Sequence, residues 1–374
     1  MNESTHDLTL IEMGFEHPRS AHVAPLSTTR LAQAKLAYTP RRVPVGQMAT
    51  LLSGDLKPRA GDLVLARVTR TRQHGRLELA SGRRASLYEG DDIIVCYGNR
   101  YAPDQFEALV PANLGPCHLV AAGGIAARML CKHSKIKAPT EITPVGLIGD
   151  HRGRRLNLAD WTVARKGDRH PRPLTVAVVG TSMNAGKTTS AAYLARGLAR
   201  SGLKVGAAKI TGTGAGGDVW AMKDAGVHEA VDFTDAGLAS TYCAPAKQVQ
   251  EIATTLINHL QAGGAEAIVL ELADGLFQQE TAALIKAPCF TSRIDGIVFA
   301  AADAMGAAAG VQWLQRYGIN VLGVSGVLTA SPLAIRETEE AVDLPVLDKD
   351  ALMEPGAVAN LARQSPSWAT AEAV

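Results

Sequence analysis

The feature that most constrains the fold is a series of five short apolar runs in the carboxyl-terminal half of the chain. Each run is followed by a segment with helical spacing, and the runs occupy residues 174–179, 204–209, 267–272, 296–300 and 320–324. Strands that are apolar throughout are typical of a parallel sheet with helices on both faces. The sequence therefore predicts an α/β domain over residues 174–374, with a mostly parallel sheet flanked by helices.

The segment between the first apolar run and a helix expected over residues 188–200 carries a phosphate-binding motif. It reads GTSMNAGKTT from Gly180 to Thr189, and we interpret it as a P-loop, G-x-x-x-x-G-K-[ST], with a strand before it and a helix after it. Successive backbone amides of such a loop point at phosphate oxygens, and the helix start adds a partial positive charge. We expect Lys187 to bridge the outer phosphates and the Thr188 hydroxyl to ligate Mg²⁺. The expected nucleotide-binding residues are Gly180, Thr181, Asn184, Ala185, Gly186, Lys187, Thr188 and Thr189.

Residues 174–352 resemble the SIMIBI branch of P-loop proteins, which includes dethiobiotin synthetase and the MobB-type molybdopterin-guanine dinucleotide proteins. The segment NAGKTT, residues 184–189, resembles the MobB loop. The segment KVGAAKITGTG, residues 204–214, resembles the second strand of dethiobiotin synthetases, which ends in a lysine near the substrate. The resemblance implies that role for Lys209, while an ordinary lysine at a strand end is the alternative.

The same resemblance implies two carboxylate ligands of Mg²⁺. Asp218 follows two glycines at the position of the synthetases' magnesium-contacting aspartate, and Glu271 ends the third strand where they carry a glutamate facing the metal. With Thr188, phosphate oxygens and water, these groups complete an octahedral shell. The alternative for each carboxylate is a helix cap or a surface acid. The expected catalytic residues are Lys187, Lys209, Asp218 and Glu271, and the expected metal ligands are Thr188, Asp218 and Glu271.

The sequence also departs from the synthetases. The glycine-rich run after their glutamate is replaced by LADG at residues 272–275, and no asparagine follows the fifth strand, so adenine recognition is assumed. Ser182 stands where partitioning ATPases carry a lysine, which disfavours a dimerising ATPase switch. The guanine-reading motif Asn-Lys-x-Asp is missing, which weighs against a GTPase metallochaperone.

The first half of the chain has a different pattern. Residues 61–101 hold short alternating runs separated by glycine turns, which predict a small antiparallel barrel or sandwich. Residues 1–57 show no sustained period apart from a short helix expected within 28–36, and residues 121–130 are expected to form a helix introduced by two glycines. That helix start is expected either to bind an anion or to pack at a tight turn. We expect a β-rich domain over 1–163, a charged linker over 164–173 and the P-loop domain over 174–374.

Charge and cysteine content limit the kinds of binding partner that we expect. The formal net charge is +2, from 38 Lys plus Arg against 36 Asp plus Glu, which gives no general attraction to nucleic acid or to membranes. The 5 cysteines lack paired spacing, and Cys131 with His133 is too small a set for zinc. With no visible secretory signal, we expect a cytoplasmic protein that binds a small molecule, a homodimer being an open option.

Three functions remain open from the sequence. The leading hypothesis is an enzyme dependent on ATP and Mg²⁺, kinase- or ligase-like, that phosphorylates a small acidic or carbamate-like substrate. The second is a nucleotide-driven switch or cofactor-insertion NTPase that acts on a protein partner. The third is a CoA-dependent N-acyltransferase, implied by a faint resemblance to a P-loop family with amino-acid N-acetyltransferase members. Segments 232–235 and 240–242 are expected to line a substrate cleft.

Overall fold

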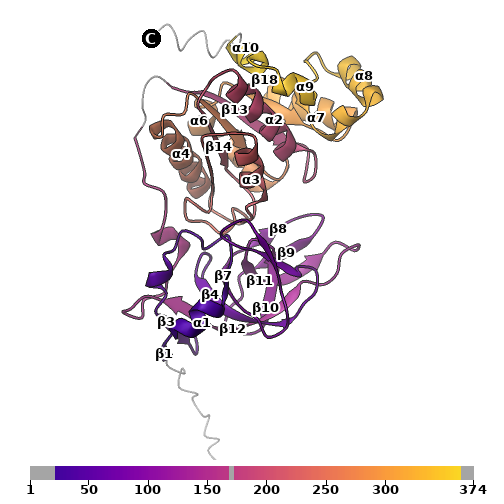
Figure 1. Ribbon diagram of the computed structural model, residues 1–374. Coiled ribbons are helices and arrows are strands. Elements are labelled where there is room, and N and C mark those ends of the chain that lie inside the picture. The colour runs from indigo at the N-terminus through magenta and orange to yellow at the C-terminus, as the bar shows by residue number, and fades with distance from the viewer. Residues whose placement is uncertain (1–21, 168–171, 364–374) are drawn as a thin grey trace, which may run out of the picture.

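The computed structural model of the chain describes residues 22–167 and 172–363. It contains a β-rich amino-terminal domain and a carboxyl-terminal α/β domain, which lie against one another (Figure 1). Four residues of the expected linker, 168–171, lie outside the described residues.

The α/β domain is built on a six-stranded sheet in which all neighbouring strands run parallel. The strand order is β15-β14-β16-β13-β17-β18. Strand β13, which leads into the P-loop, is therefore a central strand with at least two strands on each side of it. The strands are β13 (Leu174–Gly180), β14 (Val205–Lys209), β15 (Glu229–Asp232), β16 (Ala267–Glu271), β17 (Gly296–Ala300) and β18 (Val321–Ser325). The predicted parallel α/β fold is confirmed.

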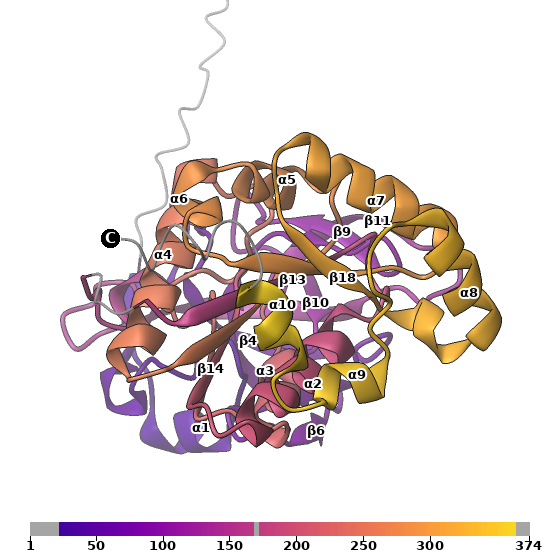
Figure 2. The ribbon, with the colours of Figure 1, turned by 90° about the horizontal axis from the view of Figure 1, so that it is seen from above.

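Helices cover both faces of this sheet because the strand residues alternate between two cores. Ala177 and Val179 of β13 face one core, whereas Val176 and Val178 face the other. Figure 2 shows α6 and α7 on one side of the sheet and α2, α3 and α9 on the other. The helices are α2 (Lys187–Arg200), α3 (Gly217–Asp224), α4 (Ala246–Ala262), α5 (Gln279–Ile285), α6 (Pro288–Thr291), α7 (Ala304–Arg316), α8 (Pro332–Ala341), α9 (Lys349–Met353) and α10 (Ala357–Arg363), with a 3₁₀ turn η3 (Val327–Ala330).

The amino-terminal domain is a mostly antiparallel ten-stranded sheet with an additional two-stranded hairpin. Two strand pairs in it, β11 with β7 and β2 with β7, run parallel. The prediction of a β-rich domain is confirmed. Its elements are β1 (His22–Pro25), α1 (Thr28–Gln33), β2 (Lys35–Leu36), η1 (Val45–Gln47), β3 (Thr50–Ser53), β4 (Leu63–Arg70), β5 (Arg76–Glu78), β6 (Arg84–Ser86), β7 (Asp92–Tyr97), β8 (Arg100–Tyr101), β9 (Phe106–Leu109), β10 (Cys117–Ala121), β11 (Ile125–Lys132), β12 (Thr140–Gly149) and η2 (Leu158–Asp160).

The helix expected over residues 121–130 is wrong. These residues end β10, turn at Gly123 and Gly124, and continue as β11, which pairs with β10 in antiparallel fashion. Gly124 has a φ of +101°, and a Cβ on Gly123 would lie 2.2 Å from the carbonyl oxygen of Gly214 in the other domain. The two glycines therefore make a tight turn under the α/β domain, and there is no helix start here to bind an anion.

The two domains are joined by buried and partly buried polar contacts. The Tyr38 hydroxyl donates to Asp232 at 2.8 Å, and Arg41 donates to Asp235 at 2.6 Å. The Tyr242 hydroxyl donates to Glu107 at 2.9 Å. The amino-terminal domain is thus held against loops at the carboxyl edge of the parallel sheet, where open α/β sheets bind their ligands. No helix within the described residues is long and apolar enough to cross a bilayer.

Candidate functional site

The loop between β13 and α2 has the backbone conformation that a phosphate-binding turn requires. Gly186 has a φ of +95° and precedes the first residue of α2, and Asn184 has a φ of +65°. A Cβ on Gly180 would lie 2.7 Å from the carbonyl oxygen of Ala300, so only glycine fits the start of the turn. Five residues, not four, separate Gly180 from Gly186, so the predicted spacing G-x-x-x-x-G-K-[ST] is wrong here. The loop is one residue longer than that pattern.

A cavity of about 400 Å³ lies over this loop and the start of α2. It brings together side chains from the ends of β14 and β16, from the turn after β18, and from the first turns of α2 and α3. The charged and hydroxyl side chains that line it are Lys187, Thr188, Thr189, Lys209, Asp218, Glu271 and Asp274. All four expected catalytic residues therefore face one cavity, and their roles remain predictions.

Three oxygen-bearing side chains meet at the start of α2. The Thr188 hydroxyl lies 2.9 Å from Asp218 Oδ1 and 2.7 Å from Glu271 Oε1. Glu271 is 2% exposed, and its Oε2 is buried without a hydrogen-bond partner among the described residues. Burial and the nearby charge of Asp218 raise the pKa of Glu271 to about 7.

These donors fit Mg²⁺, which prefers hard oxygen ligands and keeps several water or phosphate ligands. The unpartnered oxygen of Glu271 is an observation in favour of a cation here, because a buried carboxylate oxygen without a partner is costly. No group of three or more His, Cys, Asp or Glu residues in the described part of the chain is arranged to hold a metal. A cation at Thr188, Asp218 and Glu271 would complete its shell with phosphate oxygens or water.

The lysines of the cavity are fixed by different partners. Lys187 Nζ donates to the carbonyl oxygen of Ser182 at 2.6 Å, within the loop itself, and burial lowers the pKa of Lys187. Lys209 forms an ion pair with Asp218. Burial alone would lower the pKa of Lys209, but the charges of Asp218 and Glu271 outweigh it and raise the pKa. The same lysine lowers the pKa of Asp218 against the effect of burial.

The structure adds acidic and basic groups that the sequence did not assign. Asp274 lines the cavity, and burial raises its pKa while the charges of Lys187 and Lys209 oppose that shift. From the amino-terminal domain, Asp104 accepts a hydrogen bond from Asn184 of the loop at 2.9 Å. Arg100, which is 6% exposed, lies close enough to interact electrostatically with Asp104 and Asp274. Sequence spacing gave no signal for these two residues, because 80 positions separate Asp104 from Asn184.

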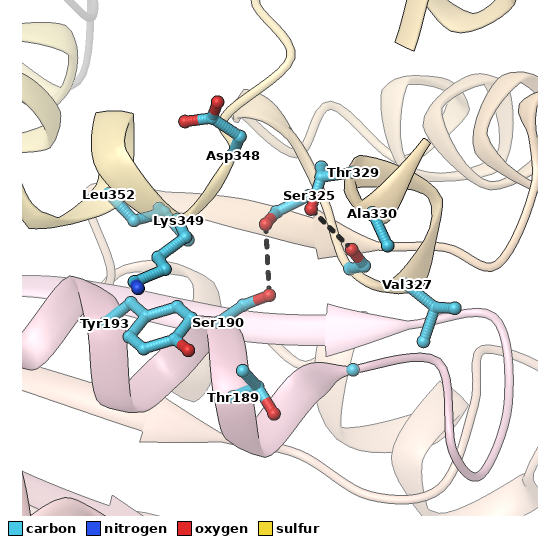
Figure 3. Close-up of a pocket in the computed structure, with 12 residues that line it drawn as sticks. Thr189, Ser190, Tyr193, Ser325, Val327, Thr329, Ala330, Asp348, Lys349 and Leu352 are labelled. Carbon is cyan, nitrogen blue, oxygen red and sulfur yellow. Dashed lines mark hydrogen bonds between the residues drawn. The ribbon is translucent and has the colours of Figure 1, made fainter. Parts of the chain in front are cut away.

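A second cavity, of about 390 Å³, adjoins the first and shares Gly186, Thr189 and Val327 with it. It lies between α2, the turn after β18 and the start of α9 (Figure 3). The hydroxyls of Ser190 and Ser325, which line it, form a hydrogen bond of 3.0 Å (Figure 3). The other side chains that line it include Tyr193, Thr329, Asp348 and Lys349.

The segments 232–235 and 240–242, expected to line a substrate cleft, mainly contact the amino-terminal domain. Asp232 is fully buried and accepts from Tyr38, while Asp235 pairs with Arg41. Tyr242 donates to Glu107. These side chains therefore hold the domains together, and the charged cavity lies instead at the P-loop.

No protein-family model and no curated protein matches the chain. Among solved structures, it is similar to the signal recognition particle 54 kDa protein of Aeropyrum pernix K1 in complex with GDP, at 20% identity and a TM-score of 0.35 over 55% of this chain and 49% of that one. The receptor FtsY of Elizabethkingia anophelis matches at 16% identity and a TM-score of 0.29, over 54% of this chain and 57% of that one. The kinase domain of the Escherichia coli tyrosine kinase ETK matches at 12% identity and a TM-score of 0.31, over 42% of this chain and 68% of that one.

The chain thus spans 49% and 57% of the length of the first two of these structures. At such TM-scores the matches support no inference about activity, so the assignment depends on the strand order and on the loop geometry of this chain. By these features its carboxyl-terminal half is a parallel α/β domain with a P-loop-like turn between β13 and α2.

Proposed function

We propose that the protein is a Mg²⁺-dependent enzyme that transfers the terminal phosphoryl group of ATP to a small anionic acceptor. The observation that carries this proposal is the convergence of Lys187, Lys209 and the Thr188–Asp218–Glu271 group on one cavity above the P-loop. Phosphoryl transfer needs positioning and charge neutralisation more than covalent help from the protein. A cavity with two lysines and a set of cation ligands supplies both.

The phosphate chain of the nucleotide would lie over the amides of the loop, with Lys187 at its outer phosphates. Magnesium held by Thr188, Asp218 and Glu271 would neutralise charge on the phosphate oxygens. Lys209 is fixed by Asp218 in the same cavity, where its charge adds to that of Lys187. The adjoining cavity beside Tyr193 and Lys349 is the place for the nucleoside, because it continues from the phosphate cavity at Gly186 and Thr189.

The acceptor would bind on the side of the phosphate cavity that faces the amino-terminal domain. Asp274 lines the cavity there, and Arg100 supplies a buried positive charge close to it. This charge favours an acceptor that carries an acidic group. Where the reacting group is a hydroxyl or an amine, its proton passes to Asp274 as its bond to the γ-phosphorus forms and the bond to ADP breaks. The raised pKa of Asp274 suits a general base.

A thermal-shift comparison of ATP, GTP and acetyl-CoA, each with Mg²⁺, tests the proposal. A ligand at one hundred times its Kd stabilises the folded state by about 2.7 kcal/mol. We expect ATP to raise the Tm of the wild type and to leave that of Lys187→Ala nearly unchanged. If only GTP raises the Tm, the nucleotide of the proposed reaction is GTP and not ATP. If only acetyl-CoA raises the Tm, the result supports an acyltransferase.

The reaction itself is tested by ADP release in the presence of small acids. Turnover that rises many-fold with an acid supports phosphoryl transfer to it, and a phosphorylated product must appear in equal amount. Turnover that no small acid raises, but that a protein partner does raise, would support a nucleotide-driven switch. The contact between Asn184 and Asp104 favours that second candidate, because it links the P-loop directly to the amino-terminal domain.

A further inference from the structure

Glu78 of the amino-terminal domain reaches into the α/β domain with both of its carboxylate oxygens. It ends β5 and is 2% exposed. Its Oε2 accepts from the backbone N–H of Gly216 at 2.9 Å, and its Oε1 accepts from the indole N–H of Trp220 at 3.0 Å. No function described so far uses this residue, although burying a carboxylate is costly unless it is hydrogen-bonded.

Both partners of Glu78 belong to the start of helix α3. Gly216 is the residue before the helix, and Trp220 lies one turn further along it. Asp218 stands between them in the first turn. The backbone N–H groups of a first turn have no partner within the helix, and the positive end of the helix dipole favours an anion. Glu78 therefore fixes the turn that carries Asp218.

The packing around this turn leaves little room for movement. A Cβ on Gly216 would lie 2.6 Å from Trp220 Nε1 and 2.7 Å from Tyr38 Cε2. On the other side, a Cβ on Gly82 would lie 2.8 Å from Trp220 Cε2. The rings of Tyr38 and Trp220 meet edge to face, with centroids 6.1 Å apart. The first turn of α3 is thus wedged into the amino-terminal domain.

We propose that Glu78 is a positioning residue for Asp218, so that the amino-terminal domain completes the cation site without contributing a ligand to it. Asp218 contacts Thr188 and pairs with Lys209, so a shift of its turn alters the geometry of both partners. This inference rests on the proposed function in one respect, that Asp218 ligates Mg²⁺. Residues that orient metal ligands from behind typically change metal affinity by about 10- to 100-fold when they are replaced.

The test is a Mg²⁺ titration of ATP hydrolysis by the full-length protein and its Glu78→Gln variant. The amide keeps one acceptor oxygen but turns an N–H₂ group toward a second donor, so one of the two hydrogen bonds is lost. We expect the half-saturating Mg²⁺ concentration to rise about tenfold. The KM for ATP at saturating Mg²⁺ should stay within about twofold, because the loop amides and Lys187 are untouched. Glu89→Gln, an exposed change in the same domain, is the matched control.

A second variant guards against misfolding of the first. Trp220→Phe removes one donor to Glu78 but keeps an aromatic ring against Tyr38, and a smaller rise in the Mg²⁺ requirement is expected. An unchanged Mg²⁺ requirement in both variants would overturn the proposal. So would an equal loss of ATP and Mg²⁺ affinity, which indicates general loosening.

Hydrogen exchange separates this proposal from the proposed function. In Glu78→Gln the amides of residues 216–224 should exchange faster than in the wild type, with or without nucleotide. If the wild type neither hydrolyses ATP nor responds to Mg²⁺, the proposed function fails, while faster exchange still supports the positioning role. Exchange that matches the wild type would refute the positioning role whatever the activity.

Discussion

Lys209 and Asp218 form an ion pair at the wall of the cavity above the P-loop, joining the end of β14 to the first turn of α3. Their side chains are only 11% and 23% exposed. A pair in this position keeps one positive and one negative side chain at the wall of the cavity, and each charge compensates the burial of the other.

Removing one partner of this pair should destabilise the fold. Lys209→Met leaves Asp218 buried without its cation, and we expect the free energy of unfolding to fall by about 3 kcal/mol. The double variant with Asp218→Asn should recover much of that loss, because no buried charge is left without a partner. Urea denaturation without nucleotide measures the free energy of unfolding of both variants. Equal stability of the single and double variants would contradict this account.

Lys187 should matter for turnover more than for folding. Its Nζ donates to the carbonyl oxygen of Ser182 within the loop itself. If it stabilises charge in the transition state, Lys187→Ala should raise the barrier by about 3 to 5 kcal/mol, or two to four decades in rate. The exposed Lys247→Ala is the control. The measurement is steady-state ADP release. Unchanged turnover in Lys187→Ala would show that Lys187 does not stabilise charge in the transition state.

The amino-terminal domain should lose stability in mild acid because of His74. Burial, with a smaller effect of the Arg100 charge, lowers the pKa of His74 from 6.5 to about 4. Between these pH values the unfolded chain binds a proton that the folded protein does not, so stability falls as the pH falls from 6.5 to 4. Because the ring is partly exposed, we expect about 2 kcal/mol over this window.

The measurement for His74 is a comparison of unfolding free energies at several pH values. Carboxylates also titrate in acid, so the quantity to examine is the difference between the wild type and His74→Gln. The variant can still donate to the carbonyl oxygen of Val120, which His74 contacts at 2.8 Å. Parallel pH profiles would show that His74 does not contribute.

A small change at Gly275 should damage nucleotide binding. A Cβ there would lie 2.3 Å from the carbonyl oxygen of Thr181, so Gly275→Ala must push the P-loop out of place. We expect the Kd for ATP to rise at least about tenfold, a change of about 1.4 kcal/mol. Gly46→Ala, with nothing within 4 Å of the added carbon, is the matched control. Calorimetric titration with ATP would reveal equal affinities if this expectation is wrong.

The sequence predicted the parallel sheet well because its central strands are apolar on both faces. Residues 174–179 and 267–272 correspond to β13 and β16, whose residues are all buried. The edge strand β15 was missed, since it is short and begins with the partly exposed Glu229 and Ala230. This edge strand, partly exposed over its first two residues, lacks the continuous apolar run from which the other strands were predicted.

The errors in the amino-terminal half have a tertiary cause. The alanines around Gly123 and Gly124 favour a helix locally, yet the segment forms a hairpin of β10 and β11 whose strands also pair with β7, β9 and β12. Similarly, Asp218 and Glu271 were located from a resemblance, whereas Arg100, Asp104 and Glu78 were not located at all. Their proximity to the P-loop is created by the contact between domains, which no spacing within either domain encodes.

The turn after β18 is joined to the P-loop although about 140 positions separate them in the chain. The N–H of Val327 donates to the carbonyl oxygen of Ala185 at 3.0 Å, and a Cβ on Gly326 would lie 2.4 Å from that same oxygen. Random mutagenesis that selects for loss of nucleotide binding should therefore recover substitutions at Gly326 alongside those in the motif. A search confined to the motif would miss the turn after β18, which also holds the loop in its conformation.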